Sequence, residues 1–324
     1  MTHTVALLVY PGFELLDATG PIAVFDAANH VLGQAGSKPF YALNVLSVSG
    51  GPIGSSSGVA LHSIALEAAP ARIGTLLIAG AEAGNVRAAM DEPRLSRWIL
   101  DCARSTERVG SVCSGAFLLA ALGLLDGKRA ATHWAACARL ARLYPSVQVD
   151  SEALYVNDGK LWTSAGVTAG IDMALAMACE DVGPAIVSQA AKRLVLYARR
   201  PGYQSQFSSL LTAQSRGDSP FAELIDWAHE NLSAALDVPS LAARAGLSER
   251  SFYRKFVDAT GVTPARFVET LRLDAARLLL SQGLSLKAIA LQVGLSPARL
   301  SKAFERRFGV SPILFRELHH AAPA

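Results

Sequence analysis

The sequence has few cysteines, no long apolar run and a low share of charged residues, and each shortage excludes a class of protein. Its four cysteines are scattered, without a CxxC pair or the Cys/His spacing of a metal site, so we expect neither a disulfide framework nor a bound metal. The mean hydropathy of +0.29 is positive, yet no stretch approaches the ~18 apolar residues of a membrane span. The apolar run at 4–10 has no basic segment before it and is not typical of a signal peptide. We therefore expect a cytoplasmic protein without membrane contact.

Charge is sparse and unevenly placed. Charged residues make up 18% of the chain and apolar residues 51%, which excludes a disordered chain. A length of 324 residues suggests about two domains. Residues 1–220 contain 17 basic and 17 acidic side chains, whereas residues 221–324 contain 13 and 10. The whole net charge of +3 lies in the last third, where a polyanionic partner is to be sought.

Short apolar runs alternate with segments of helical periodicity over the first 200 residues. Strands are expected at 4–10, 40–48, 75–79 and 108–112 and on both sides of the turn at 157–159, and helices at 17–32, 92–105, 116–122, after 133 and at 167–180. This order predicts an α/β domain, a doubly wound and mainly parallel sheet. A polar stretch rich in Gly, Ser, Gln and Pro predicts a linker at 201–220. Residues 221–320 are expected to be entirely helical.

A 48-residue repeat runs through this helical part. Gly246-Leu247-Ser248 recurs as Gly294-Leu295-Ser296, and GVTP at 261–264 recurs as GVSP at 309–312. Each copy has a short helix, a glycine suited to a left-handed turn, a serine suited to an N-cap and a second helix. This plan predicts two helix-turn-helix units. An ordinary helical bundle with a solvated basic face is the alternative.

The second helix of each copy is basic on its open face, as expected of a helix that enters the major groove of double-stranded DNA. The candidate DNA-binding residues are Arg250, Tyr253, Arg254 and Lys255 in the first copy, and Arg299, Ser301, Lys302, Arg306 and Arg307 in the second. We expect Arg306 and Arg307 to neutralise phosphates rather than read bases. A helix over 264–280 would separate the two units by about 24–27 Å, which with flanking turns approaches the ~34 Å of one DNA turn.

Residues 221–320 resemble the DNA-binding domain of the AraC/XylS family. The resemblance lies in two segments, AARAGLSERSFYRKFVDATGVTPARF at 242–267 and AIALQVGLSPARLSKAFERRFGVSPILF at 288–315. It implies a sequence-specific transcription regulator. RNA polymerase is then a further candidate partner.

The strand at 108–112 runs directly into Cys113-Ser114-Gly115 and an apolar helix. A strand, a sharp turn and a helix place a side chain at the carboxyl end of a sheet, where the helix N-terminus would lower a thiol pKa. Cys113 is therefore a candidate nucleophile or redox-sensitive thiol. A buried structural cysteine is the alternative on spacing alone.

Residues 4–195 resemble the DJ-1/PfpI superfamily, also called class I glutamine amidotransferase-like. The matching segments are YPGFELLDATGPIAVFD at 10–26, GSVCSGAFLLAALGLLDGKRAATHW at 110–134 and LWTSAGVTAGIDMALAM at 161–177. The resemblance implies a flavodoxin-like sheet and a homodimer through this domain. It makes Cys113 the nucleophile-elbow cysteine and Asp17 the acidic residue beside it.

The chain departs from the family's catalytic pattern in two places. Ser114 stands where peptidase-like members have His, and Gly80-Ala81 stands where two glycines are usual. The backbone N–H groups of Gly80 and Ala81 remain candidates for an oxyanion nest. His133 is a base candidate, although its place at a helix start favours a capping or packing role, and Glu14 ranks second to Asp17 as the acidic group.

These residues predict a candidate effector or vestigial catalytic site, without a cofactor. The site residues are Asp17, Gly80, Ala81, Cys113, Ser114 and His133. A one-component regulator that binds a small metabolite is the leading hypothesis. Asp17 would suit a nitrogenous effector, and Trp134, Trp162 or Tyr10 would add cation–π contact if they line the pocket. A cysteine-dependent hydratase or amidase, or a redox sensor that forms a sulfenic acid at Cys113, are the alternatives.

Overall fold

The computed structural model describes residues 2–196, 200, 202, 206, 221–260, 262–281, 283–308 and 311–319. The chain divides into two compact units, Met1–Gln206 and Phe207–Ala324. Apart from Gly202 and Gln206, the predicted linker at 201–220 lies outside the described residues. Within the described part, no helix is both long and apolar enough to cross a membrane.

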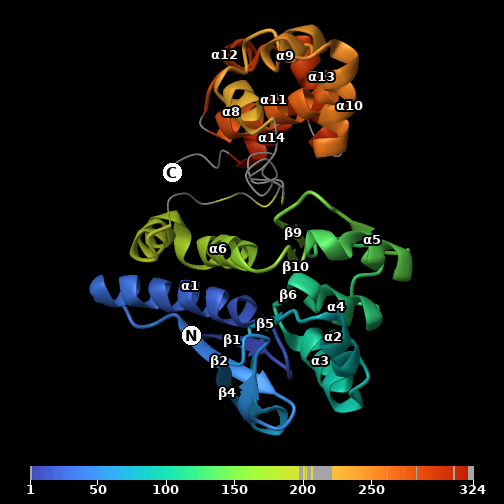
Figure 1. Ribbon diagram of the computed structural model, residues 1–324. Helices are drawn as coiled ribbons and strands as arrows, with labels where there is room; N and C mark the ends of the chain where they lie inside the picture. The colour runs from blue at the N-terminus through green and yellow to red at the C-terminus, as the bar shows by residue number, and fades with distance from the viewer. Residues whose placement is uncertain are drawn as a thin grey trace. The chain divides into compact units, whose positions relative to one another are not determined.

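The first unit is an eight-stranded sheet with the order β3-β4-β2-β1-β5-β6-β10-β9 (Figure 1). Its strands are β1 (His3–Leu8), β2 (Tyr41–Ser47), β3 (Gly51–Gly54), β4 (Ala60–Ala65), β5 (Thr75–Ile78), β6 (Arg108–Val112), β9 (Tyr155–Asp158) and β10 (Leu161–Ser164). The central pairs are parallel, and the two edge pairs, β3–β4 and β9–β10, are antiparallel. A separate parallel pair joins β7 (Arg129–Ala130) to β8 (Gln148–Val149).

Helices cover both faces of this sheet. On one face, α1 (Leu15–Gln34) and α6 (Thr168–Arg193) lie side by side, and on the other face lie α2 (Ala83–Met90), α3 (Pro93–Ser105), α4 (Ala116–Ala121) and α5 (Trp134–Leu143) (Figure 1). Successive strand residues point to opposite faces, so β1 contributes Val5 and Leu7 to the first face and Ala6 and Leu8 to the second. The predicted doubly wound α/β class is confirmed.

Some elements differ from the expectation. The helix expected to stop at Gly33 continues to Gln34, and the helix expected over 167–180 continues to Arg193 across a non-helical Gly183 that precedes Pro184. The β3–β4 hairpin and α2 were not expected, because each is short and carries a weak apolar period. The missed helix α2 forms one wall of the pocket described below.

The second unit is entirely helical over its described residues. Its helices are α8 (Ala222–Glu230), α9 (Val238–Arg244), α10 (Glu249–Thr260), α11 (Pro264–Ser281), α12 (Leu286–Gln292), α13 (Pro297–Phe308) and α14 (Pro312–His319). Phenylalanines fill its core. Phe221, Phe252, Phe256 and Phe267 form one cluster, and Phe304 contacts Phe315 in another, with ring centroids 5.2–5.5 Å apart.

Both repeats turn as their glycines and serines predict. Gly246 and Gly294 adopt nearly the same left-handed conformation, with φ of 65° and 66°. The Ser248 hydroxyl then accepts from the N–H of Ser251 at 3.4 Å, and the Ser296 hydroxyl accepts from the N–H of Arg299 at 3.3 Å. The two helix-turn-helix units are therefore α9–α10 and α12–α13, joined by the 18-residue α11.

The two turn glycines should differ in their response to alanine. An alanine in the left-handed region costs about 1 kcal/mol at either position. A Cβ at Gly294 would also lie 2.6 Å from the Leu232 carbonyl oxygen, whereas nothing lies within 4 Å of one at Gly246. Urea unfolding of the full chain, followed by circular dichroism, should show Gly294→Ala lowering the free energy of unfolding by about 2 kcal/mol or more and Gly246→Ala by about half as much. Equal losses would contradict the packing assigned to Gly294.

Candidate functional site

Cys113 sits at a sharp turn where β6 ends and a short 3-10 turn leads into α4. Its φ of 56° lies in the left-handed region, which is unusual for a residue with a side chain. Backbone crowds around it: a Cβ at Gly80 would lie 2.7 Å from the Cys113 Cβ, and a Cβ at Gly166 would overlap it. The close approach of Gly80 and Gly166 leaves room for the cysteine and for little else.

Asp17 lies beneath this turn and is wholly buried on α1. Its Oδ2 accepts from the N–H of Gly80 at 3.0 Å, and its Oδ1 accepts from the N–H of Val167 at 2.7 Å. The Cys113 side chain also lies close enough to lower the pKa of this carboxyl slightly. Burial raises the pKa of Asp17 to about 6, although the bonds from Val167 and Gly80 oppose the rise.

The expectation that the helix N-terminus lowers the thiol pKa is wrong. Burial, followed by the negative charge of Asp17, raises the pKa of Cys113 to about 12, and hydrogen bonds to Ser114 oppose this only partly. Desolvation and a neighbouring anion therefore outweigh the helix dipole. The thiol stays protonated at neutral pH.

The expected oxyanion nest is filled by the chain's own atoms. The N–H of Ala81 donates to the Ser114 hydroxyl at 2.9 Å, and this hydroxyl donates back to the Ala81 carbonyl at 2.6 Å. The N–H of Gly80 is bound by Asp17. Neither N–H is free to stabilise a developing oxyanion, which such a nest requires.

His133 and Glu14 line the same pocket as the cysteine, and no described hydrogen bond joins either side chain to it. The described hydrogen bonds do not join the His133 ring to Cys113; the ring lies against Trp134, with centroids 5.3 Å apart. Burial lowers its pKa, so the imidazole is neutral at pH 7. Glu14 accepts a hydrogen bond from Ser56 at 3.0 Å. His133 stands directly before α5 and gives that helix no side-chain cap.

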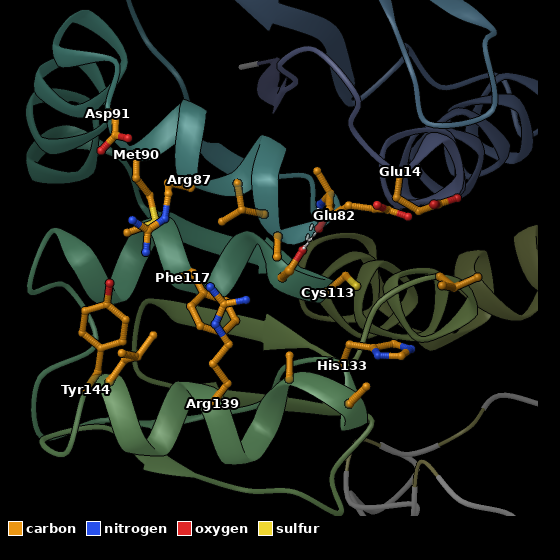
Figure 2. A pocket seen from close by; sticks show the side chains of 18 residues that line it. Glu14, Glu82, Arg87, Met90, Asp91, Cys113, Phe117, His133, Arg139 and Tyr144 are labelled. Carbon is orange, nitrogen blue, oxygen red and sulfur yellow. Dashed lines mark hydrogen bonds between the residues drawn. The ribbon is translucent and has the colours of Figure 1, made fainter.

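A pocket of about 750 Å³ opens above the turn (Figure 2). Cys113, Ser114, Ala81 and His133 line it, whereas Asp17 and Gly80 do not. The pocket continues between α2 and α5 over a largely apolar wall. The further lining side chains are Glu14, Glu82, Ala83, Val86, Arg87, Met90, Asp91, Phe117, Ala135, Ala136, Arg139, Leu143, Tyr144 and Val167. Within the described residues, no group of three or more His, Cys, Asp or Glu side chains is placed to hold a metal.

The expected aromatic contacts for a cationic effector are also wrong. Tyr10 and Trp162 are buried, Trp134 lies outside the pocket lining, and the aromatic lining residues are Phe117 and Tyr144. Asp17 faces backbone amides beneath the pocket and cannot meet an amine there. Four of the six candidate site residues, Ala81, Cys113, Ser114 and His133, line this pocket, and their role in binding a ligand stays a prediction.

The expected DNA-binding side chains divide into two groups. Exposed on α10 and α13 are Arg250, Tyr253, Arg254, Lys255, Arg299 and Lys302, with Ser301 half-buried. Arg306 instead pairs with Glu269 at 2.6 Å, and Arg307 binds Thr270 at 2.8 Å and Asp274 at 3.4 Å, all on α11. These two arginines connect the end of α13 to the connecting helix. Their phosphate contacts stay a prediction.

Comparison with known proteins confirms both resemblances. The DJ-1/PfpI family model matches residues 3–180, and a helix-turn-helix domain model matches residues 241–318. The chain is 32% identical to the HTH-type transcriptional regulator CdhR of Pseudomonas aeruginosa over 96% of this chain and 91% of that protein. It is 30% identical to the isonitrile hydratase of Pseudomonas putida over 78% and 97%. The crystal structure of a THiJ/PfpI family protein from Pseudomonas syringae matches with a TM-score of 0.56 and 26% identity, over 70% of this chain and 87% of that one.

The raised pKa of Asp17 predicts a specific pH dependence. Because the folded state binds this proton more tightly than an unfolded Asp with a pKa of 3.8, the contribution of Asp17 to stability falls as pH rises from about 4 to about 6. The difference between 3.8 and 6 corresponds to about 3 kcal/mol. Thermal melts from pH 4 to 7 should therefore show wild type losing stability relative to Asp17→Asn. Parallel profiles for the two proteins would show that Asp17 does not titrate in this window.

Proposed function

The chain belongs to the DJ-1/PfpI family and ends in an AraC-type helix-turn-helix domain, and from this premise we propose a one-component transcription regulator whose first unit binds a small metabolite without converting it. One observation carries the proposal. An open pocket of about 750 Å³ lies directly beside a catalytic turn whose thiol is protonated and whose N–H groups are occupied. Such a site can hold a ligand and has no free group to activate it.

Hydrogen bonds link this pocket to the chain segment that leaves the first unit. The Thr132 hydroxyl donates to the Cys113 carbonyl at 2.8 Å. The Gln206 amide donates at 3.0 Å both to the Thr132 carbonyl and to the Ala153 carbonyl. His133, the neighbour of Thr132, lines the pocket. A ligand that displaces the loop around His133 would therefore strain or break the Gln206 hydrogen bond to Thr132. Regulation requires that the ligand bind the displaced and the undisplaced conformations of this loop with different affinities.

Arg250, Arg254, Arg299 and Lys302 supply the DNA contacts in this proposal. All four are exposed on the second helices of the two helix-turn-helix units. At 1.5 Å per residue the 18-residue α11 is about 27 Å long, so the two units could engage successive major-groove segments. A homodimer through the first unit, and contact with RNA polymerase, belong to the same proposal.

DNA binding is tested by the affinity of the full chain for its own upstream DNA. Arg254→Ala and Lys302→Ala should each weaken binding about 5- to 150-fold if they contact base edges, or reduce the salt dependence by about one charge if they contact phosphates. Arg142→Ala, an exposed arginine on α5 of the first unit, is the matched control and should bind as wild type. Unchanged affinity in both second-unit variants would overturn the assignment of α10 and α13 as reading helices.

A hydratase is the second candidate, and two observations favour it. Asp17 and Cys113 lie close enough for each to shift the pKa of the other, and the isonitrile hydratase of Pseudomonas putida is similar over most of this chain. An enzyme of this kind, like a redox sensor, needs a reactive Cys113. The thiol pKa of about 12 and the filled nest weigh against both.

The rate at which Cys113 is alkylated distinguishes the hydratase and redox-sensor hypotheses from ligand sensing. At pH 8 a thiol with a pKa of about 12 should react with iodoacetamide roughly 10³-fold more slowly than an unperturbed cysteine, because only the thiolate attacks. Peptide mass spectrometry against the urea-unfolded chain measures the ratio at each of the four cysteines. Asp17→Asn should speed the reaction, since it removes the anion that opposes the thiolate. Native Cys113 reacting as fast as in the unfolded chain would favour the enzyme or the redox sensor.

A further inference from the structure

Two arginines enter the pocket from opposite walls, away from the cysteine. Arg87 lies on α2 and Arg139 on α5, and both line the pocket. Figure 2 shows the Arg139 guanidinium over the Phe117 ring and the Arg87 guanidinium on the side of that ring that faces away from Cys113 and His133. Both residues are exposed, so neither guanidinium is needed to fill the protein core.

The two cations have no anionic partner in the part of the chain that the structure describes. None of the described salt bridges includes Arg87 or Arg139. Arg139 lies over the Phe117 ring, 5.6 Å from its centroid. Both arginine charges act on the Tyr144 phenol, where they oppose the rise in its pKa that burial causes. Arg87, Arg139 and Tyr144 therefore lie close to one another at one end of the pocket.

The surroundings favour one kind of anion. Phe117 packs edge-on against Tyr144 with centroids 6.4 Å apart, and Val86, Met90 and Leu143 add apolar surface. Guanidinium groups beside such a surface bind a planar carboxylate through paired hydrogen bonds. A tyrosine hydroxyl can donate one more.

The charge balance of the pocket limits the ligand to a single negative charge at this end. Its lining includes three carboxylates, Glu14, Glu82 and Asp91, against two guanidinium groups and a neutral imidazole. In Figure 2, Glu14 and Glu82 lie on the side of Cys113. Asp91 lies at the end of the pocket where Arg87 lies, so two guanidinium groups face one carboxylate there. That excess of one positive charge is balanced by a monoanion, whereas the second charge of a dianion such as a phosphate monoester would have no cation to balance it.

We propose that Arg87, Arg139 and Tyr144 form a carboxylate-binding subsite, and that the effector is a small monocarboxylate whose other end points toward Cys113. This assignment rests on the proposed sensing function of the pocket. The sequence led us to expect a cationic amine bound at Asp17. The proposed subsite instead binds an anionic carboxylate, through residues that lie outside the sequence motifs.

The test compares acids with their neutral amides. The full chain is melted with a panel of monocarboxylates of three to seven carbons, amino acids among them, each paired with its primary amide at 10 mM. At least one acid should raise the melting temperature by several degrees where its amide does not. Calorimetry should then give a Kd for that acid at least tenfold weaker in Arg87→Gln and in Arg139→Gln. Arg142→Gln, an exposed arginine on α5 outside the lining, is the matched control and should bind as wild type.

Several results would overturn the subsite. One is that no acid in the panel stabilises wild type more than its amide does. Another is that the stabilising acid binds the double variant Arg87→Gln/Arg139→Gln with an unchanged Kd. A metabolite that shifts DNA affinity yet binds this double variant normally also contradicts the subsite, while the regulator stands. An acid that needs both arginines but leaves DNA affinity unchanged supports the subsite and counts against the proposed function.

Discussion

The buried carboxylate of Asp17 holds the first unit together at its functional turn. It receives one backbone N–H from Gly80, after β5, and one from Val167, before α6, while it lies on α1. Three segments far apart in the chain thus meet at one side chain below Cys113. A buried charge is tolerated only when its hydrogen bonds are satisfied. Here the bond from Gly80 also takes up an N–H group that a reaction at the Cys113 turn would need.

The position of Asp17 affects Cys113 directly, and hydrogen bonds connect the same turn to the chain segment that leaves the first unit. Burial, and after it the Asp17 charge, keeps the Cys113 thiol protonated, and the Asp17 bond to Gly80 occupies one of the two N–H groups that an oxyanion would need. Ser114 occupies the other. Thr132 connects the same turn to Gln206. Arg87 of α2 and Arg139 of α5, to which we assign ligand recognition, line the same pocket, and none of the described salt bridges includes either one.

Much of this architecture could be predicted from the sequence, because its signals are local. Strand-and-helix alternation indicated the sheet, a 48-residue repeat indicated two helix-turn-helix units, and the resemblance to the DJ-1/PfpI family placed Asp17 beside Cys113. The sign of the thiol pKa change could not be predicted, since it depends on burial and on a charge 96 positions away in the chain. Arg87 and Arg139 look like ordinary surface cations in the sequence. Only the fold, which places the eight-residue α2 and α5 on opposite walls of one pocket, brings them together.

The central claim is that the first unit controls DNA binding by holding a ligand and not by converting it. The most direct measurement is the affinity of the full chain for its upstream DNA, with and without the small molecule that most raises its melting temperature, in wild type and in Cys113→Ala. The account predicts a ligand-dependent change in affinity that Cys113→Ala retains within about threefold, with the ligand recovered intact. Loss of the response in Cys113→Ala together with consumption of the ligand by wild type would contradict it.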